Sequence, residues 1–235
     1  FRDRAYSACD SAEQVLISFL RQSGRFDLTA AEYAVAAQIL DYARDNKMEP
    51  VVLAAERLLK SRGCMLVLQR DMERGESLRL AKQLGLDYAP YAMAAINEDF
   101  QRNYHYIDLL MSEEEYAVRL IHLFEEKLPL DEMAAGSADE MGLGEAFTDY
   151  RILVYMIQHL KNRPGMGVRL IQTALKAPVV NNRNMALTVL EEWVKDKGCS
   201  LGNCYPDLHQ LLLELRESEV RHDIRTRMDA LAGLK

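Results

Sequence analysis

Five arginines near the C-terminal end of the chain are the first candidates for a binding site. Arg216, Arg221, Arg225 and Arg227 lie close together in the sequence, and Arg183 lies on an earlier predicted helix. Arg221 and Arg225 are one helical turn apart, so with Arg183 they could form a basic stripe that holds a phosphate or an acidic peptide. Acidic residues alternate with these arginines, however, so a solvated face of mutually paired charges is the default alternative.

The histidines and cysteines give incomplete motifs. Glu219-x-x-His222 has the spacing of half a di-iron site, but the other histidines lack a glutamate three residues before them. We therefore expect no metal role and interpret Glu219 as an exposed helix-start residue. Cys199 and Cys204 have no second cysteine pair for zinc, and a reversible disulfide is conceivable, but two free thiols are the favoured interpretation.

Two further histidines, His122 and His159, lie among apolar residues, and we expect both to be hydrogen-bonded core residues rather than catalysts. The single tryptophan, Trp193, falls on an apolar stripe and is expected to pack in the core. No complete catalytic set and no phosphate-binding loop are found, so the sequence favours a non-enzyme without a cofactor.

The elements that would position these residues are helices. The chain has 235 residues, of which 49% are hydrophobic and 28% charged, and few turn-forming residues. Apolar residues recur with helical spacing, as in the stripe Tyr33, Ala36, Ala37, Leu40 and Ala43. Thr29 with Glu32, and Ser112 with Glu115, have the spacing of capping boxes. The C-terminal half predicts helices at 145–162, 165–176, 181–197, 206–218 and 220–232, while 104–108 could be a short strand or an irregular helix.

Residues 165–198 and 205–233 each show two helices separated by a short break. Their second helices contain Asn184-Met185-Ala186-Leu187 and Arg227-Met228-Asp229-Ala230-Leu231, and their first helices begin about 40 residues apart, which is a HEAT or armadillo period. With Pro178 after the first helix, this region resembles HEAT repeats. The resemblance implies an all-α fold of antiparallel helix pairs stacked as a HEAT-like α-solenoid. A non-repetitive helical bundle is the alternative.

The acidic, glycine-containing segment 129–144 separates two helical regions, 1–128 and 145–235, and is interpreted as a linker or mobile loop, although one continuous domain is equally compatible. Proteins that resemble HEAT repeats mostly act as scaffolds, so we expect a protein or peptide partner for a concave face that carries Arg183, Arg221 and Arg225. The alternatives are a HEAT-like nucleic-acid enzyme such as a DNA glycosylase, or a regulatory domain of a longer protein, since the chain begins at Phe1.

The net charge of −7 counts against general nucleic-acid binding. The absence of a long apolar run counts against a membrane protein, and the cytoplasm is the expected location.

Overall fold

A computed structural model describes residue 14, residues 16–20 and residues 30–234 of the chain. Within these residues the regular structure is helical throughout, and the β-type pairing is a single isolated bridge between Glu140 and Val179. The chain divides into two compact units, Phe1–Ala94 and Ala95–Lys235. The all-α class predicted from the sequence is therefore confirmed. The division lies at a different place from segment 129–144, which belongs entirely to the second unit.

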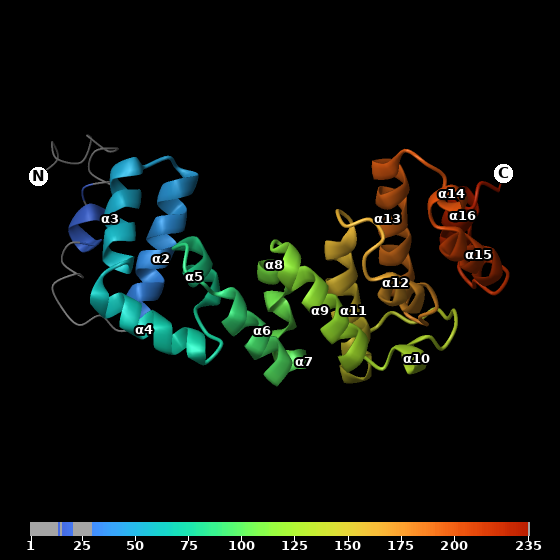
Figure 1. The fold of residues 1–235 in the computed structure, drawn as a ribbon, viewed down its shortest axis with the longest axis horizontal. Coiled ribbons are helices and arrows are strands. Elements are labelled where there is room, and N and C mark those ends of the chain that lie inside the picture. Colours follow the sequence, from blue (N-terminus) through green and yellow to red (C-terminus); the bar gives the residue numbers. More distant parts are fainter. Residues whose placement is uncertain (1–13, 15, 21–29, 235) are drawn as a thin grey trace, which may run out of the picture. The chain divides into compact units, whose positions relative to one another are not determined.

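Unit 1 is built around an antiparallel helix pair, α2 and α3, joined by a short turn (Figure 1). Ala36, Leu40 and Ala43 of α2 are fully buried against the pair's interface, as the predicted stripe requires. Pro50 occupies the first turn of α3, where its missing N–H costs no hydrogen bond. The helices of this unit and of its boundary with unit 2 are α2 (Ala30–Asp45), α3 (Glu49–Leu59), α4 (Arg62–Glu73), α5 (Leu78–Gln83) and α6 (Ala89–Glu98).

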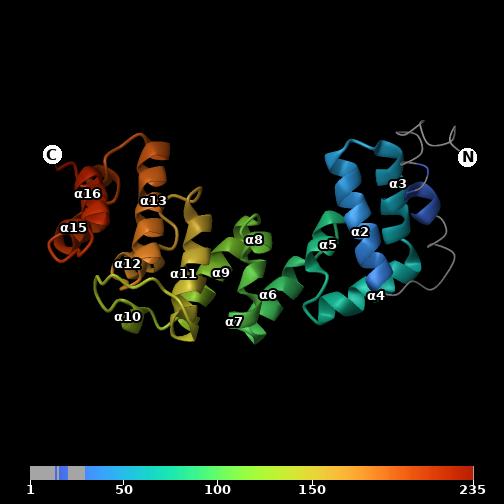
Figure 2. The same ribbon diagram turned by 180° about the vertical axis from the view of Figure 1, so that it is seen from behind.

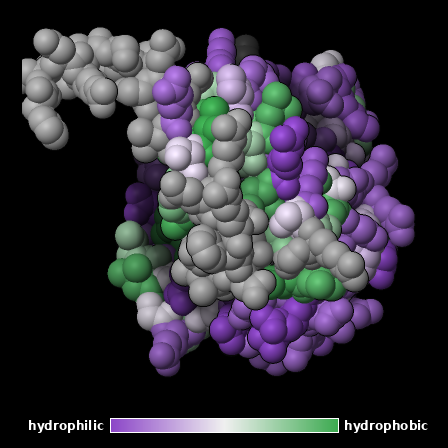
Figure 3. Space-filling view, turned by 90° about the vertical axis from the view of Figure 1, so that its left-hand side faces the viewer, coloured by the Kyte–Doolittle hydropathy of each residue, from purple (hydrophilic) through white to green (hydrophobic). Residues whose placement is uncertain are grey.

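The face of unit 1 that carries α3 is shown in Figure 3, where hydrophobic side chains gather near the middle and hydrophilic ones lie around them. Leu53 of α3 is exposed beside a shallow cavity of about 500 Å³ that Ile17, Leu20 and Leu58 also line.

Unit 2 begins with short helices and continues with longer paired ones, seen from the other side in Figure 2. Its elements are α7 (Phe100–Asn103), η1 (Tyr104–Tyr106), α8 (Ile107–Leu110), α9 (Glu114–Lys127), α10 (Leu130–Met133), η2 (Glu145–Phe147), α11 (Thr148–Ile157), η3 (Gln158–Leu160), α12 (Val168–Leu175), α13 (Val180–Lys197), α14 (Leu201–Cys204), α15 (Pro206–Leu215) and α16 (His222–Leu231). Segment 104–108 is thus irregular helix rather than strand.

The C-terminal helices of unit 2 pack in a regular order. Helix α12 contacts α13, and α15 contacts α16; in addition α12 contacts α15, and α13 contacts α16. Fully buried apolar side chains from α11, α12, α13, α15 and α16 fill the space between them. Trp193 is buried in this core, and its indole N–H donates to the carbonyl of Leu160 at 2.7 Å, so the prediction for this residue is confirmed.

One helix end differs from the prediction. Ser112 does not cap α9: its hydroxyl donates to the carbonyl of Leu109 at 2.8 Å, and the helix starts two residues later, after Glu113. The proposed capping box at Thr29 and Glu32 lies partly outside the described residues. Across the described part of the chain, no helix combines the length and the apolar character that crossing a bilayer requires.

Candidate functional site

The three arginines predicted to form a binding stripe all contact one residue, Glu219. Arg183 lies in the first turn of α13, and Glu219 lies in the segment that joins α15 to α16. The Arg183 side chain is 0% exposed and the Glu219 side chain 1%. Nε of Arg183 is 2.8 Å from Oε2 of Glu219, and Nη2 donates to Oε1 at 3.2 Å. A buried ion pair of this kind holds its two chain segments together.

The remaining donors of Arg183 are used by backbone carbonyls. Nη1 donates to the carbonyl oxygens of Ala177 and Pro178 at 2.7 and 2.8 Å, and Nη2 donates to that of Ala138 at 2.7 Å. The guanidinium therefore joins three segments of unit 2. It does not face an open groove, so the expected exposed stripe through Arg183 is absent from this arrangement.

Arg221 and Arg225 lie next to the buried pair on its solvent side. The backbone N–H of Arg221 donates to Oε1 of Glu219 at 2.9 Å, and its guanidinium pairs with Asp139 at 3.1 Å and with Asp223 at 3.0 Å. The hydrogen bond from Arg221 lowers the pKa of Asp223. Nη2 of Arg225 donates to the backbone carbonyl of Glu219.

The other two arginines are paired as well: Arg216 with Asp229, and Arg227 with Glu191. The default alternative, a face of mutually paired charges, describes this surface.

The contacts of these arginines fasten residues 137–145, which we call the clamped loop, onto the C-terminal helices. Arg183 holds the carbonyl of Ala138, Arg221 holds the carboxylate of Asp139, and the backbone N–H of Val220 donates to Ser137 Oγ at 3.3 Å. The backbone of Glu140 donates to Pro178 and accepts from Val180, which makes the isolated bridge. The segment predicted as a linker or mobile loop is thus hydrogen-bonded along most of its length.

The clamped loop presents two large apolar side chains to solvent. Met141 is 69% exposed and Leu143 is 77% exposed. Between them Gly142 is buried, with φ of +73°, and a Cβ there would lie 2.8 Å from Val179. Nη1 of Arg151 donates to the carbonyls of Gly142 and Gly144 at 3.2 and 2.6 Å. The backbone that carries the apolar pair is therefore fixed from both sides.

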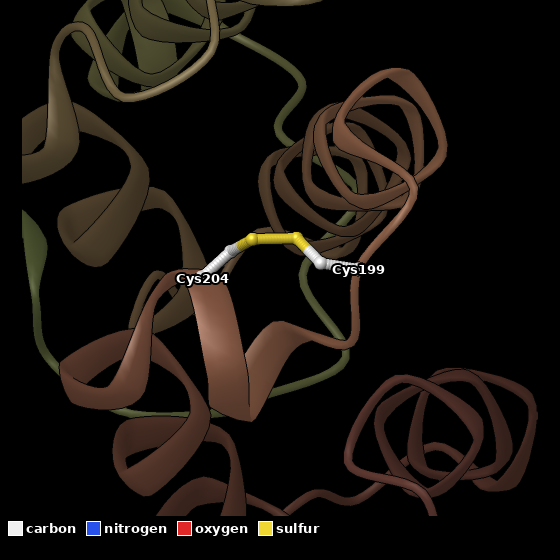
Figure 4. The surroundings of a disulfide bond; sticks show 2 residues. All are labelled: Cys199 and Cys204. Atoms are coloured by element: carbon white, nitrogen blue, oxygen red, sulfur yellow. A yellow bond between two sulfur atoms is a disulfide. The ribbon is translucent and has the colours of Figure 1, made fainter.

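Cys199, in the turn after α13, and Cys204, the last residue of α14, form a disulfide (Figure 4). The prediction of two free thiols is therefore wrong for this pair. The turn starting at Gly198, in the left-handed region at φ +63°, and the short helix α14 bring the Cα atoms of the two cysteines to 6.3 Å. Cys64 is buried and is not disulfide-bonded, and Cys9 lies outside the described residues.

The described residues contain no group of three or more histidine, cysteine, aspartate or glutamate side chains that could hold a metal ion. Glu219 of the Glu219-x-x-His222 motif is occupied by Arg183, so its interpretation as an exposed helix-start residue is wrong. His122 is 71% exposed, so its expected place in the core is wrong as well.

His159 lines a polar cavity of about 620 Å³ together with Asp108, Lys161, Asn162 and Arg163. Its Nε2 is buried without a hydrogen-bond partner, and its ring packs against Tyr155. Burial lowers the pKa of His159, and the charge of Asp108 opposes this change. His159 is therefore half-buried at the wall of a cavity, and the hydrogen bond expected of a core histidine is missing at its Nε2.

Sequence reasoning missed the partnership of Arg183 and Glu219, although one signal for it was present. Arg183 lies three, four and seven residues before Ala186, Leu187 and Leu190, so it occupies a position of the apolar stripe of α13. A charged residue at a stripe position is expected to be buried and paired. The identity of its partner, 36 residues later, has no comparable local signal.

Comparisons with known proteins found no family model that matches the chain, no similar curated protein and no similar solved structure.

Proposed function

We propose that this chain is a non-catalytic protein-binding module and that the clamped loop is its contact surface. The observation that carries the proposal is the exposure of Met141 and Leu143 on a backbone that is hydrogen-bonded on both sides. Large apolar side chains on a loop are ordinarily turned inward or tolerated singly. Two of them on one fixed segment form a small exposed apolar patch, the kind of surface feature that marks interaction sites.

Binding at a fixed loop is favourable because little conformational entropy remains to be lost. A mobile loop must be ordered when the partner arrives, whereas the clamped loop is already held by Arg183, Arg151 and Arg221. Each Å² of apolar surface that a partner covers contributes roughly 25 cal/mol. The apolar pair therefore supplies binding free energy, and because the loop is already ordered, little of that free energy is lost to ordering it.

The charge around the apolar pair defines the chemistry of the partner. Glu140 precedes Met141, Glu145 follows Gly144, and all four of Glu140, Met141, Leu143 and Glu145 are exposed. Two cations lie nearby: Arg221, which Asp139 and Asp223 balance, and Arg151, which donates to the carbonyls of Gly142 and Gly144. The acids Glu140 and Glu145 together outweigh the charge of Arg151. The surface is apolar at its centre and acidic at its edge, so the partner is a segment with apolar residues flanked by lysine or arginine.

The helix order of unit 2 supports a scaffold of stacked helix pairs. Helices α12 and α15 begin at Val168 and Pro206, and they contact each other as first helices of neighbouring HEAT-like repeats would. The second helices, α13 and α16, also contact each other. This order favours the HEAT-like α-solenoid hypothesis for residues 165–233 over an irregular bundle.

The proposal is tested with two designed amphipathic helical peptides that share a leucine face and carry either lysine or glutamate on the polar face. We expect the lysine peptide to bind the full chain, measured by fluorescence anisotropy, and the glutamate peptide to bind at least about tenfold more weakly. The double variant Met141→Ser with Leu143→Ser should weaken binding of the lysine peptide by about tenfold or more.

The matched control is Val118→Ser on α9 of the same unit, which removes another exposed apolar side chain. It should leave the affinity unchanged. Equal losses in the control and the double variant, or equal binding of both peptides, would overturn the proposal. So would binding to duplex DNA at physiological salt that is lost in Arg221→Glu and Arg225→Glu, because that result supports the nucleic-acid alternative.

A further inference from the structure

Unit 1 contains a second kind of site, an open cavity of about 600 Å³ between α2, α4 and α5. Its walls are largely apolar and come from Ala37, Val67, Leu68 and Leu80. The volume lies within the range of about 300–1,000 Å³ that small-molecule sites occupy. All the lining residues belong to unit 1, on α2, α4, α5 and the segment that joins α4 to α5.

Among the residues that the structure describes, three carboxylates but only one cationic side chain line this cavity. The acids are Asp41, Asp71 and Glu76, and the cation is Arg79. Even with one acid balanced by Arg79, the lining keeps an excess of negative charge. The apolar walls and this excess together define what the cavity can accept.

Two of the acids are held in place by uncharged donors. Nε2 of Gln83 donates to Asp41 Oδ1 at 2.7 Å, and the hydroxyl of Ser77 donates to Asp71 Oδ2 at 3.4 Å. These contacts orient the carboxylates without neutralising them, so both keep acceptor capacity for a ligand.

The acids do not converge on one point. No group of three potential metal ligands was found among the described residues, which include these three acids. Negative charge spread around apolar walls suits an elongated organic cation rather than a bare metal ion.

We propose that this cavity binds small organic amines that carry an apolar body, with the body against Leu68 and its neighbours and the ammonium group against Asp41, Asp71 and Glu76. The apolar walls favour an aromatic or branched body by removing its surface from water. The carboxylates favour a cation and reject an anion of the same shape. This site is independent of the clamped loop, so the two proposals fail or succeed separately.

Three indole compounds with different head groups test the site: tryptamine is a cation, tryptophol is neutral and indole-3-acetate is an anion. The full chain, labelled with ¹⁵N, is titrated with each and followed by amide chemical shifts. We expect tryptamine to bind with a dissociation constant of about 1 mM or tighter and to shift amides of α2, α4 and α5. Tryptophol should bind at least about tenfold more weakly, and indole-3-acetate more weakly still.

The variant pair Asp71→Asn with Glu76→Gln removes two charges at nearly constant shape. It should weaken tryptamine binding by about tenfold and leave tryptophol binding unchanged. The matched control, Asp45→Asn with Asp87→Asn, changes the charge of unit 1 equally at exposed positions outside the cavity, and it should have no effect.

Circular dichroism of both pairs establishes that each is folded. A second variant, Ala37→Leu, fills the cavity without changing charge and should weaken tryptamine and tryptophol alike. Equal affinity for the three compounds, amide shifts outside α2, α4 and α5, no detectable binding of tryptamine, or an equal loss in the control pair would overturn the proposal.

Discussion

The buried pair of Arg183 and Glu219 permits a quantitative test of how unit 2 is held together. Glu219→Gln keeps the shape of the side chain and one carbonyl oxygen, which can still accept the backbone N–H of Arg221. It removes the negative charge that lies 2.8 Å from Nε of Arg183. The guanidinium then remains buried with carbonyl partners only.

Removing one partner of a buried ion pair costs about 3–5 kcal/mol of unfolding free energy. We expect the lower end, about 3 kcal/mol, because Arg183 still donates to the carbonyls of Ala138, Ala177 and Pro178. With a urea dependence of roughly 1.5 kcal/mol per molar for a unit of this size, the unfolding midpoint should fall by about 2 M. Arg183→Met should cost more, because it leaves the buried Glu219 carboxylate without a counter-charge, with the backbone N–H of Arg221 as its donor, and removes a donor from three carbonyls.

The assay is urea unfolding of the full chain followed by tryptophan fluorescence. Trp193 is the only tryptophan in the sequence and is buried in unit 2, so its emission reports on this unit. The matched control is Glu217→Gln, which removes the same charge from an ion pair with Arg216 whose carboxylate is exposed. Its midpoint should move by no more than about 0.7 M, because exposed pairs contribute roughly 0–1 kcal/mol.

The reasoning also fixes the result of the double variant. The double variant Arg183→Met with Glu219→Gln should lose less unfolding free energy than the sum of the losses in the two single variants. The reason is that the second change no longer leaves a buried charge without its partner. Losses that add fully would show that the two side chains do not interact. A midpoint for Glu219→Gln that equals that of Glu217→Gln would refute the buried-pair argument altogether.

Two further outcomes are expected from unit 2. Burial lowers the pKa of His159 in the folded chain, so the unfolded chain binds more protons as the pH falls. The unfolding free energy should therefore be highest above the unfolded histidine pKa of about 6.5 and should decline below it. The urea midpoint of the full chain, compared at about pH 7.5 and about pH 5.5, should show this decline, and a His159→Gln variant with an undiminished decline would contradict the assignment. Reducing the disulfide between Cys199 and Cys204 opens a short loop and should lower the stability of unit 2 by about 2 kcal/mol in the same fluorescence assay. Alkylation of both cysteines before any reductant is added would contradict the bond itself.

The helical fold was predictable because its signal is local. The stripe Ala36, Leu40 and Ala43 is buried as its spacing requires, and Trp193 lies in the core. Helix ends were less predictable, because a serine hydroxyl can bond to the preceding turn as well as cap the next helix. Ser112 donates to the carbonyl of Leu109 instead of capping α9. The turn through Gly165 and Gly167, which both have positive φ, shortens the predicted helix at 165–176 to begin at Val168.

The arrangement of the arginines was only half predictable. Interleaved acids correctly indicated paired charges for Arg221, which binds Asp223 two residues away. Arg183 binds partners at positions 138 and 219, far along the chain in both directions. No local sequence pattern predicts either contact. The same holds for the clamped loop. Its acidic, glycine-containing composition is typical of a mobile segment, but the bonds that hold it come from other segments.

The clamp also determines when during synthesis this surface can form. Residues 137–139 are held by partners 45, 82 and 83 residues further along the chain. While the ribosome is still adding α15, Arg183 and the loop have been made but Glu219, Val220 and Arg221 have not. The bonds from Arg151, Val180 and Arg183 can therefore form first, whereas those to Ser137 and Asp139 must wait for Val220 and Arg221. A chain that stops before residue 219 keeps the first set of bonds, but its loop is fastened on one side only.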